Sequence, residues 1–142
     1  MMWSVLALMV CISFLSGCGN SNKQAPIVPQ VEAAKETVHR KISAEEAYKM
    51  LSEIKDVVLL DVRTEEEYKE MRIDGAVLIP DTEIRGRAEK ELPDKNKIIL
   101  VYCRSGRRSA NAARELAGLG YTNVNDIGGI VDWPYETVRG GK

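Results

Sequence analysis

The sequence predicts an α/β protein with an open, mostly parallel sheet. Two continuous apolar runs of strand length, over 57–62 and 97–103, are typical of parallel strands that are buried on both faces. Segments with helical spacing and helix-start signals alternate with the apolar runs along the chain. Because strands and helices alternate, we expect an open α/β sheet with the helices packed against it.

The N-terminal region has a different character from the rest of the chain. Its apolar run, Val5 to Leu15, is too short to cross a bilayer as a helix, which takes roughly 20 residues. The run fits the h-region of a secretory signal peptide, and the "LSGC" at its end resembles the lipobox of bacterial lipoproteins. We therefore expect a signal peptide over 1–17 and lipidation of Cys18, although no Lys or Arg precedes the run. An uncleaved anchor is the alternative; both place the domain outside the cytoplasm, attached to the cell membrane.

The part of the chain after the lipobox divides into a tether and one domain. Residues 18–40 contain Asn, Ser, Gln and two prolines with little apolar periodicity, which predicts a flexible tether. A domain is expected over 41–142. It opens with "SAEEAYKMLSE", in which Ser43 and Glu46 have the spacing of a capping box and the apolar residues fall on one helical face.

The remaining elements follow the same alternation. After the apolar strand at 57–62, a helix is expected over 64–71, where Glu67 stands three residues after Thr64. A short strand, a weak helix, a strand, a helix and a last short strand are then expected over 76–80, 85–92, 97–103, 107–119 and 123–127.

Length and charge limit the class of protein. The chain has 142 residues and a formal net charge of −1, which fits about one domain and gives no indication of nucleic-acid binding. If Cys11 leaves with the signal and Cys18 carries lipid, Cys103 is the remaining free thiol. A leftover cysteine in a secreted protein suggests a reactive or intermolecular thiol, whereas the alternative is a buried cysteine that acts as a small apolar residue.

The neighbours of Cys103 favour a reactive thiol. The cysteine ends an apolar strand and precedes a helix, at the sheet edge where open α/β proteins bind ligands. Unpaired N–H groups at the helix N-terminus favour an anion such as a thiolate, and Gly106 allows successive N–H groups to converge. With the loop arginines, these features should lower the thiol pKa below its free value of about 8.5.

Several other chemistries lack their residues. His39 is the single histidine and falls in the predicted tether, so neither a Cys/His dyad nor a zinc site is expected. The sequence has no CxxC, no GxxxxGK[ST] and no GxGxxG after a strand. We expect no metal and no organic cofactor.

Taken together, the motifs resemble those of a known family. "LLDVRTEEEYKEMRIDGAVLIP" and "YCRSGRRSANAARELAGLGYTNVNDIGGIVDW" are similar to the single-domain rhodanese (sulfurtransferase) family across 43–133. The resemblance implies a five-stranded parallel sheet with helices on both faces. It also implies a monomer in which Cys103 takes a sulfane sulfur from a small anionic donor such as thiosulfate and passes it to cyanide or a thiol.

The resemblance also implies roles for single residues. Cys103 is the expected nucleophile, and the substrate-binding loop comprises Arg104, Ser105, Gly106, Arg107 and Arg108. Arg104 and Arg107 would attract the anionic donor or leaving group, while Arg108 would either do the same or turn inward to a carboxylate. Asp61 and Arg63, at the end of a neighbouring strand, are expected to hold the loop from behind. Tyr102 and Trp133 are expected to pack rather than to touch substrate.

One segment departs from the family pattern, and three rival functions stay open. Arg72 and Asp74 stand where many members have His and Pro in "HIPGA", which predicts a changed surface. The first rival is a phosphatase or arsenate reductase, but four residues separate Cys103 from Arg108, one fewer than in those enzymes. The others are a mercaptopyruvate-type sulfurtransferase, whose loop typically has fewer arginines, and a non-catalytic sulfur carrier or docking module.

Overall fold

The apolar strands assemble into one sheet in which every pairing between strands is parallel. The computed structural model describes residues 38–140, and its sheet has the order β1-β5-β4-β2-β3. The most apolar strands, β2 and β4, therefore lie inside the sheet, as their continuous apolar runs predict. The strands are β1 (Val38–Lys41), β2 (Val57–Asp61), β3 (Val77–Leu78), β4 (Ile98–Cys103) and β5 (Asn123–Gly129).

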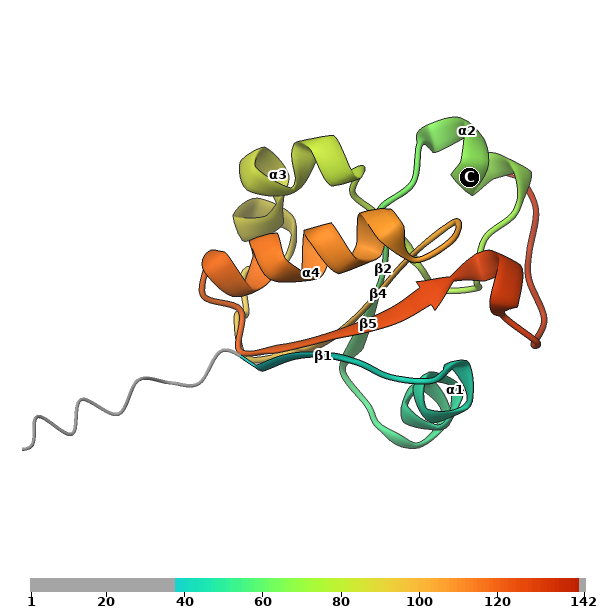
Figure 1. The fold of residues 1–142 in the computed structure, drawn as a ribbon, viewed down its shortest axis with the longest axis horizontal. Coiled ribbons are helices and arrows are strands. Elements are labelled where there is room, and N and C mark those ends of the chain that lie inside the picture. The colour runs from blue at the N-terminus through green and yellow to red at the C-terminus, as the bar shows by residue number, and fades with distance from the viewer. Residues whose placement is uncertain (1–37, 141–142) are drawn as a thin grey trace, which may run out of the picture. The chain divides into compact units, whose positions relative to one another are not determined.

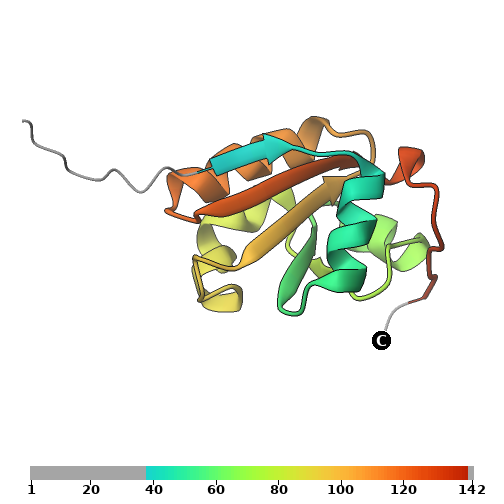
Figure 2. The ribbon, with the colours of Figure 1, turned by 90° about the horizontal axis from the view of Figure 1, so that it is seen from below.

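Helices cover both faces of this sheet. In Figures 1 and 2, α1 lies against one face, and α3 and α4 lie against the other. Helix α2 stands beyond the carboxyl end of β2, at the edge where the Cys103 loop also lies (Figure 1). The helices are α1 (Ala44–Glu53), α2 (Glu65–Glu70), α3 (Ile84–Glu91) and α4 (Arg107–Gly118), with short 3-10 turns η1 (Asp81–Glu83) and η2 (Ile130–Asp132).

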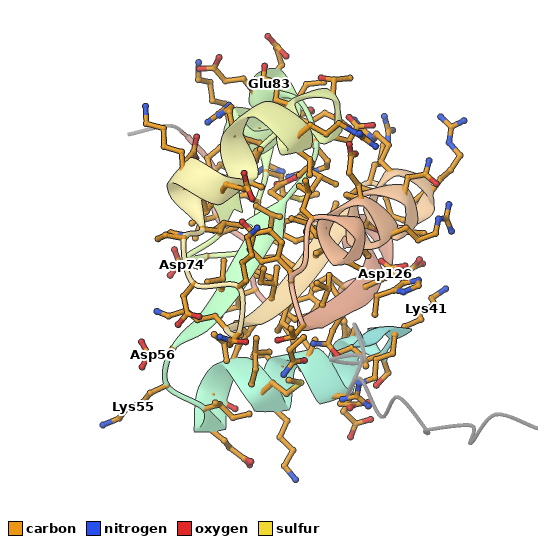
Figure 3. All side chains as sticks on the ribbon, turned by 90° about the vertical axis from the view of Figure 1, so that its left-hand side faces the viewer. Lys41, Lys55, Asp56, Asp74, Glu83 and Asp126 are labelled. Carbon is orange, nitrogen blue, oxygen red and sulfur yellow. The ribbon has the colours of Figure 1, made fainter. Side chains whose placement is uncertain are left out.

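Alternation along β4 divides the core into two halves. Ile99, Val101 and Cys103 pack with α3 and α4, whereas Leu100 and Tyr102 pack on the α1 side, as the two-residue period of a strand requires. Figure 3 shows carbon-rich side chains filling both layers, while charged side chains such as Lys55 extend outward. The same alternation decides that Cys103 faces the N-terminus of α4.

The helix starts match the predicted caps to different degrees. In α2 the capping box is complete: the Thr64 hydroxyl accepts the Glu67 N–H at 3.3 Å, and the Glu67 carboxylate accepts the Thr64 N–H at 3.1 Å. In α1 the Ser43 hydroxyl accepts the Glu46 N–H at 3.1 Å. Glu46 instead pairs with Arg40 at 2.9 Å, so the capping box expected there is half formed.

The expected tether boundary at residue 40 is wrong by a few residues. Val38 to Arg40 belong to β1, the edge strand that pairs with β5, and the short, charged VHRK segment gives little apolar signal. The local sequence pattern therefore predicts four strands, and the family resemblance alone implies the fifth. The expected signal peptide over 1–17, the Cys18 lipidation site and the tether up to residue 37 lie outside the described residues. Within residues 38–140, no helix is long and apolar enough to cross a membrane.

Candidate active site

The site is centred on Cys103, the last residue of β4. Its side chain is 1% exposed and faces the loop that leads into α4. Gly106 begins that helix with a left-handed φ of 94°, a conformation that favours glycine. This conformation directs the Gly106 N–H toward the sulfur, and the N···Sγ distance is 3.1 Å.

Ser109 and Asp126 complete the surroundings of the sulfur, and neither was predicted from the sequence. The Ser109 hydroxyl lies 3.7 Å from Sγ and donates to Asp126 Oδ1 at 2.6 Å. Asp126 is buried on β5 and also accepts the Gly128 N–H at 3.0 Å. The sequence offered one signal for Asp126, which is a carboxylate within a predicted strand. A buried carboxylate needs a hydrogen-bonding or charged partner.

These contacts shift the thiol toward its reactive form. Burial raises the pKa of Cys103, but the Ser109 N–H and hydroxyl and the N–H groups of Gly106 and Ser105 lower it by more, so the pKa lies below that of an ordinary thiol. The direction is the predicted one. The main causes that lower it are hydrogen bonds at the start of α4, and Arg108 adds a charge interaction with the thiol.

Two glycines of β5 let the loop lie against the sheet. A Cβ on Gly129 would overlap the Arg104 carbonyl oxygen and would stand 2.7 Å from Ser105 Cα. A Cβ on Gly106 would lie 3.4 Å from Gly128 Cα. Gly128 itself follows a shift in the β4–β5 register and has a φ of 86°. In the "GG" of the sequence, Gly129 therefore allows the close approach of two backbones, whereas Gly128 takes a left-handed φ that favours glycine.

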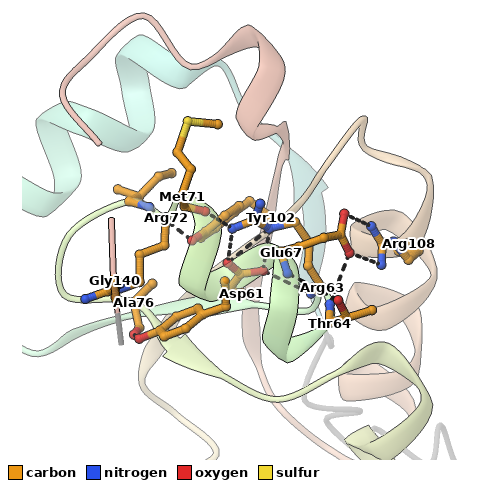
Figure 4. A network of polar contacts seen from close by, with 12 residues as sticks. Asp61, Arg63, Thr64, Glu67, Met71, Arg72, Ala76, Tyr102, Arg108 and Gly140 are labelled. Carbon is orange, nitrogen blue, oxygen red and sulfur yellow. Dashed lines mark hydrogen bonds and ion pairs between the residues drawn. The ribbon is translucent and has the colours of Figure 1, made fainter. Parts of the chain in front are cut away.

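The three arginines of the loop are not equivalent. Arg108 turns inward and forms two hydrogen bonds with the Glu67 carboxylate, both at 2.8 Å (Figure 4), which is the second of the two alternatives left open by the sequence. The sequence predicted Glu67 only as part of the capping box of its helix. The pKa of its carboxyl is lowered, chiefly by the hydrogen bonds with Arg108. Arg104 and Arg107 are exposed.

Asp61 and Arg63 form a buried ion pair at the carboxyl end of β2. Figure 4 shows the Arg63 guanidinium against the Asp61 carboxylate, with an Nη2···Oδ2 distance of 2.6 Å. Both residues are less than 5% exposed, and Arg63 also donates to the Met71 carbonyl at 2.6 Å. The pair thus fixes the end of β2 to the end of α2.

The two aromatic residues expected to pack do so. Tyr102 is fully buried, its hydroxyl accepts the Ile73 N–H at 3.2 Å, and the Arg63 guanidinium lies 5.5 Å from its ring centre. Trp133 contacts Tyr135 edge to face, with ring centres 5.1 Å apart. In residues 38–140, no group of three His, Cys, Asp or Glu side chains is placed to hold a metal ion.

Comparison with known proteins places this site in a family context. A model of the rhodanese-like domain matches residues 43–135. The thiosulfate sulfurtransferase PspE of Escherichia coli K12 is 40% identical over 81 residues, which cover 57% of this chain and 78% of that protein. The putative sulfur carrier protein YrkF of Bacillus subtilis 168 is 34% identical over 122 residues, 85% of this chain and 59% of that protein.

A solved structure agrees with these matches. A rhodanese from E. coli, determined with anions, superposes with a TM-score of 0.56 at 38% sequence identity. The superposition covers 59% of this chain and 99% of that protein. The residues matched by the family model, 43–135, include the Cys103 loop and strands β2 to β5.

Proposed function

The chain belongs to the rhodanese-like domain family, and from that membership together with the geometry of its loop we propose that it is a thiosulfate sulfurtransferase acting through Cys103. The observation that carries the proposal is the sulfur of Cys103 at the N-terminus of α4, 3.1 Å from the Gly106 N–H, with a lowered thiol pKa. A thiolate held in this way is an activated nucleophile without a histidine base. The fold places it where open α/β sheets bind substrates.

The first half-reaction loads one sulfur atom onto the enzyme. The Cys103 thiolate attacks the outer sulfur of thiosulfate, and a bond forms between Sγ and that sulfur. The bond to the sulfonate sulfur breaks, and its electron pair leaves with sulfite. The product is a persulfide anion on Cys103, and the total charge is unchanged.

The loop stabilises the transferred sulfur. As the negative charge moves from Sγ to the outer sulfur, the N–H groups of Ser105, Gly106 and the first turn of α4 surround it. Such preorganised donors stabilise a developing anion without reorganisation. Arg104 and Arg107 attract the dianionic donor from solvent, whereas Arg108 is held by Glu67 and shapes the loop.

The second half-reaction regenerates the thiolate. Cyanide attacks the outer persulfide sulfur, the S–S bond breaks, and thiocyanate leaves while the electron pair returns to Sγ. A thiolate acceptor reacts in the same way and leaves as a persulfide. These two displacements constitute a ping-pong cycle, and neither step needs a metal or an organic cofactor.

A second candidate function is a sulfur carrier that holds the persulfide for a protein partner. The match to a putative sulfur carrier over 85% of this chain favours it. Both candidates require the persulfide on Cys103. They differ in whether small acceptors discharge it with turnover.

Intact mass measures the proposed cycle directly. The whole chain with Cys11→Ser and Cys18→Ser contains Cys103 as its one thiol, and the same chain with Cys103→Ser is the control. We expect thiosulfate to add the mass of one sulfur atom to the first protein and none to the second, and cyanide to remove it as thiocyanate. A protein that gains no sulfur would overturn the proposal, and one that gains sulfur but resists cyanide and small thiols would favour the carrier.

Localisation forms a separate part of the proposal. The lipobox-like "LSGC" supports cleavage after residue 17, lipid attachment at Cys18 and an extracytoplasmic, membrane-anchored domain. In a bacterial host, the native chain should incorporate labelled fatty acid and fractionate with membranes. Cys18→Ser should lose the label, and a label that persists in this variant would contradict the proposed site.

A further inference from the structure

The C-terminal segment forms a strap along α2. The Arg72 N–H donates to the Val138 carbonyl at 2.9 Å, and the Val138 N–H donates to the Arg72 carbonyl at 2.8 Å. The Gly140 N–H donates to the Lys69 carbonyl at 2.8 Å. The residues on both sides of Arg139 are therefore fixed to the end of α2, and Figure 1 shows the red segment ascending beside this helix.

The Arg72 side chain adds a second fastening. Its guanidinium donates to the Gly140 carbonyl and lies 4.8 Å from the centre of the Tyr68 ring; Figure 4 places Arg72 close to Gly140. Arg72 is one of the two residues that depart from the family pattern. Its long side chain reaches the strap from the segment between α2 and β3.

The strap forms one wall of a cavity beside the Cys103 loop. The cavity has a volume of about 360 Å³ and is lined by Arg104 from the loop, Val131 from η2, and Glu67 and Glu70 from α2, with Arg139 from the strap. Three other cavities in the described part of the chain, of about 870, 580 and 150 Å³, include no residue of 103–108. Of these four cavities, the one of about 360 Å³ is the one that includes a residue of the loop, Arg104, although it is not the largest.

Two of the five charged side chains that line this cavity are already neutralised by ion pairs. Arg63 pairs with Asp61, and Glu67 pairs with Arg108. Among residues 38–140, the side chains of Arg104, Arg139 and Glu70 enter no ion pair. The cavity lining thus contains two guanidinium groups and one carboxylate outside ion pairs, and this balance favours an anion.

We propose that Arg139 is a further substrate-binding residue, which together with Arg104 holds the sulfonate end of the donor while the outer sulfur meets Cys103. The inference rests on the proposed sulfurtransferase function. Planar guanidinium groups suit the oxygens of an oxyanion. Because the sulfonate carries charge both before and after sulfur transfer, this contact acts on binding of the donor more than on the chemical step.

The test compares three substitutions in the whole chain. Arg139→Gln removes the charge and leaves the backbone bonds of the strap, Arg139→Lys restores the charge, and Arg114→Gln removes an exposed arginine of α4 as the matched control. Steady-state turnover measures KM for thiosulfate and kcat at low and high ionic strength.

We expect Arg139→Gln to raise KM about 2- to 5-fold at low ionic strength with kcat nearly unchanged, which corresponds to one exposed charge contact. The effect should shrink in high salt, and Arg139→Lys should recover most of it. An Arg139→Gln protein with the KM of the Arg114→Gln control would overturn the role of Arg139. Failure of the unsubstituted chain to gain sulfur would overturn the proposed function itself, so the two failures are distinguishable.

Discussion

Gly129→Ala tests whether the close contact between β5 and the loop sets the reactivity of Cys103. Gly129 has φ −107° and ψ 142°, a region that alanine adopts freely. The substitution therefore acts through the added Cβ and not through backbone strain. That atom would overlap the Arg104 carbonyl oxygen and stand 2.7 Å from Ser105 Cα, where ordinary contact begins at 3.4 Å.

The size of the effect follows from these distances. The loop must move by at least about 0.7 Å to restore contact with the new atom, and both neighbours are backbone atoms that cannot rotate away. A shift of that size disturbs the N–H groups of Ser105 and Gly106 that lower the thiol pKa. One lost hydrogen bond to a charged group costs roughly 1.5–3 kcal/mol, which raises the thiol pKa and, at a pH below that pKa, reduces the thiolate population about 10- to 100-fold.

The assay is the pH dependence of alkylation of Cys103 by iodoacetamide, in the chain that lacks Cys11 and Cys18. The lowered pKa predicts that the rate for the parent protein rises with pH earlier than for a free thiol. In Gly129→Ala the rise should move to higher pH, and turnover at neutral pH should fall by the same factor. Gly86→Ala, which adds a Cβ in open space on α3, serves as the control.

Stability separates this effect from unfolding. Overpacking of this kind costs about 1–3 kcal/mol, which urea denaturation measures independently. If folded Gly129→Ala reacted with the same pH profile as Gly86→Ala, the contact with β5 would not control the thiol, and the reasoning from geometry to reactivity would fail.

Three further perturbations follow from the contacts of the site. Ser109→Ala removes a hydroxyl that lowers the thiol pKa, so alkylation of Cys103 at neutral pH should slow about 2- to 10-fold. An unchanged rate would show that the hydroxyl does not activate the thiol. Glu67→Gln weakens the pair with Arg108 and should cost about 1 kcal/mol at neutral pH. Because the Glu67 pKa is lowered in the folded protein, this difference should begin to shrink as pH falls below the ordinary value of about 4.3 and vanish below the lowered pKa. A difference that persists at still lower pH would contradict the role of the ion pair. Asp61→Asn leaves Arg63 buried without its counter-charge and should lower the free energy of unfolding by about 3–5 kcal/mol, as measured by urea denaturation. A double variant in which both side chains are replaced by apolar ones should change this free energy little.

The inner part of the fold could be predicted because its signals are local. The continuous apolar runs of β2 and β4 and the capping pattern of Thr64 and Glu67 all correspond to observed elements. Strand β1 could not be predicted in this way, because Val38 to Lys41 are stabilised by pairing with β5. Such pairing joins residues about 85 positions apart, and no local periodicity records it.

The candidate site also has a part that the local sequence predicts and a part that depends on the fold. Cys103 and Gly106 stand in one short segment, so their spacing alone indicates a thiol at a helix N-terminus. Asp126 and Glu67 reach the site from other elements, and their partners become evident only when β5 and α2 lie against the loop. Sequence alone therefore left two directions open for Arg108, and the contact with Glu67 chose between them.

The departure at Arg72 shows how a substitution outside the loop bears on the same site. A change at the turn before β3 was expected to alter the surface more than the chemistry, since this segment supplies no nucleophile. The Arg72 backbone and guanidinium instead hold Val138 and Gly140, and so position Arg139 at the cavity beside Arg104. Arg72→Ala retains the two backbone bonds and loses the side-chain clamp. Its effect on KM should therefore be smaller than that of Arg139→Gln and in the same direction, because the strap would still pair with α2 while its charged residue moved more freely.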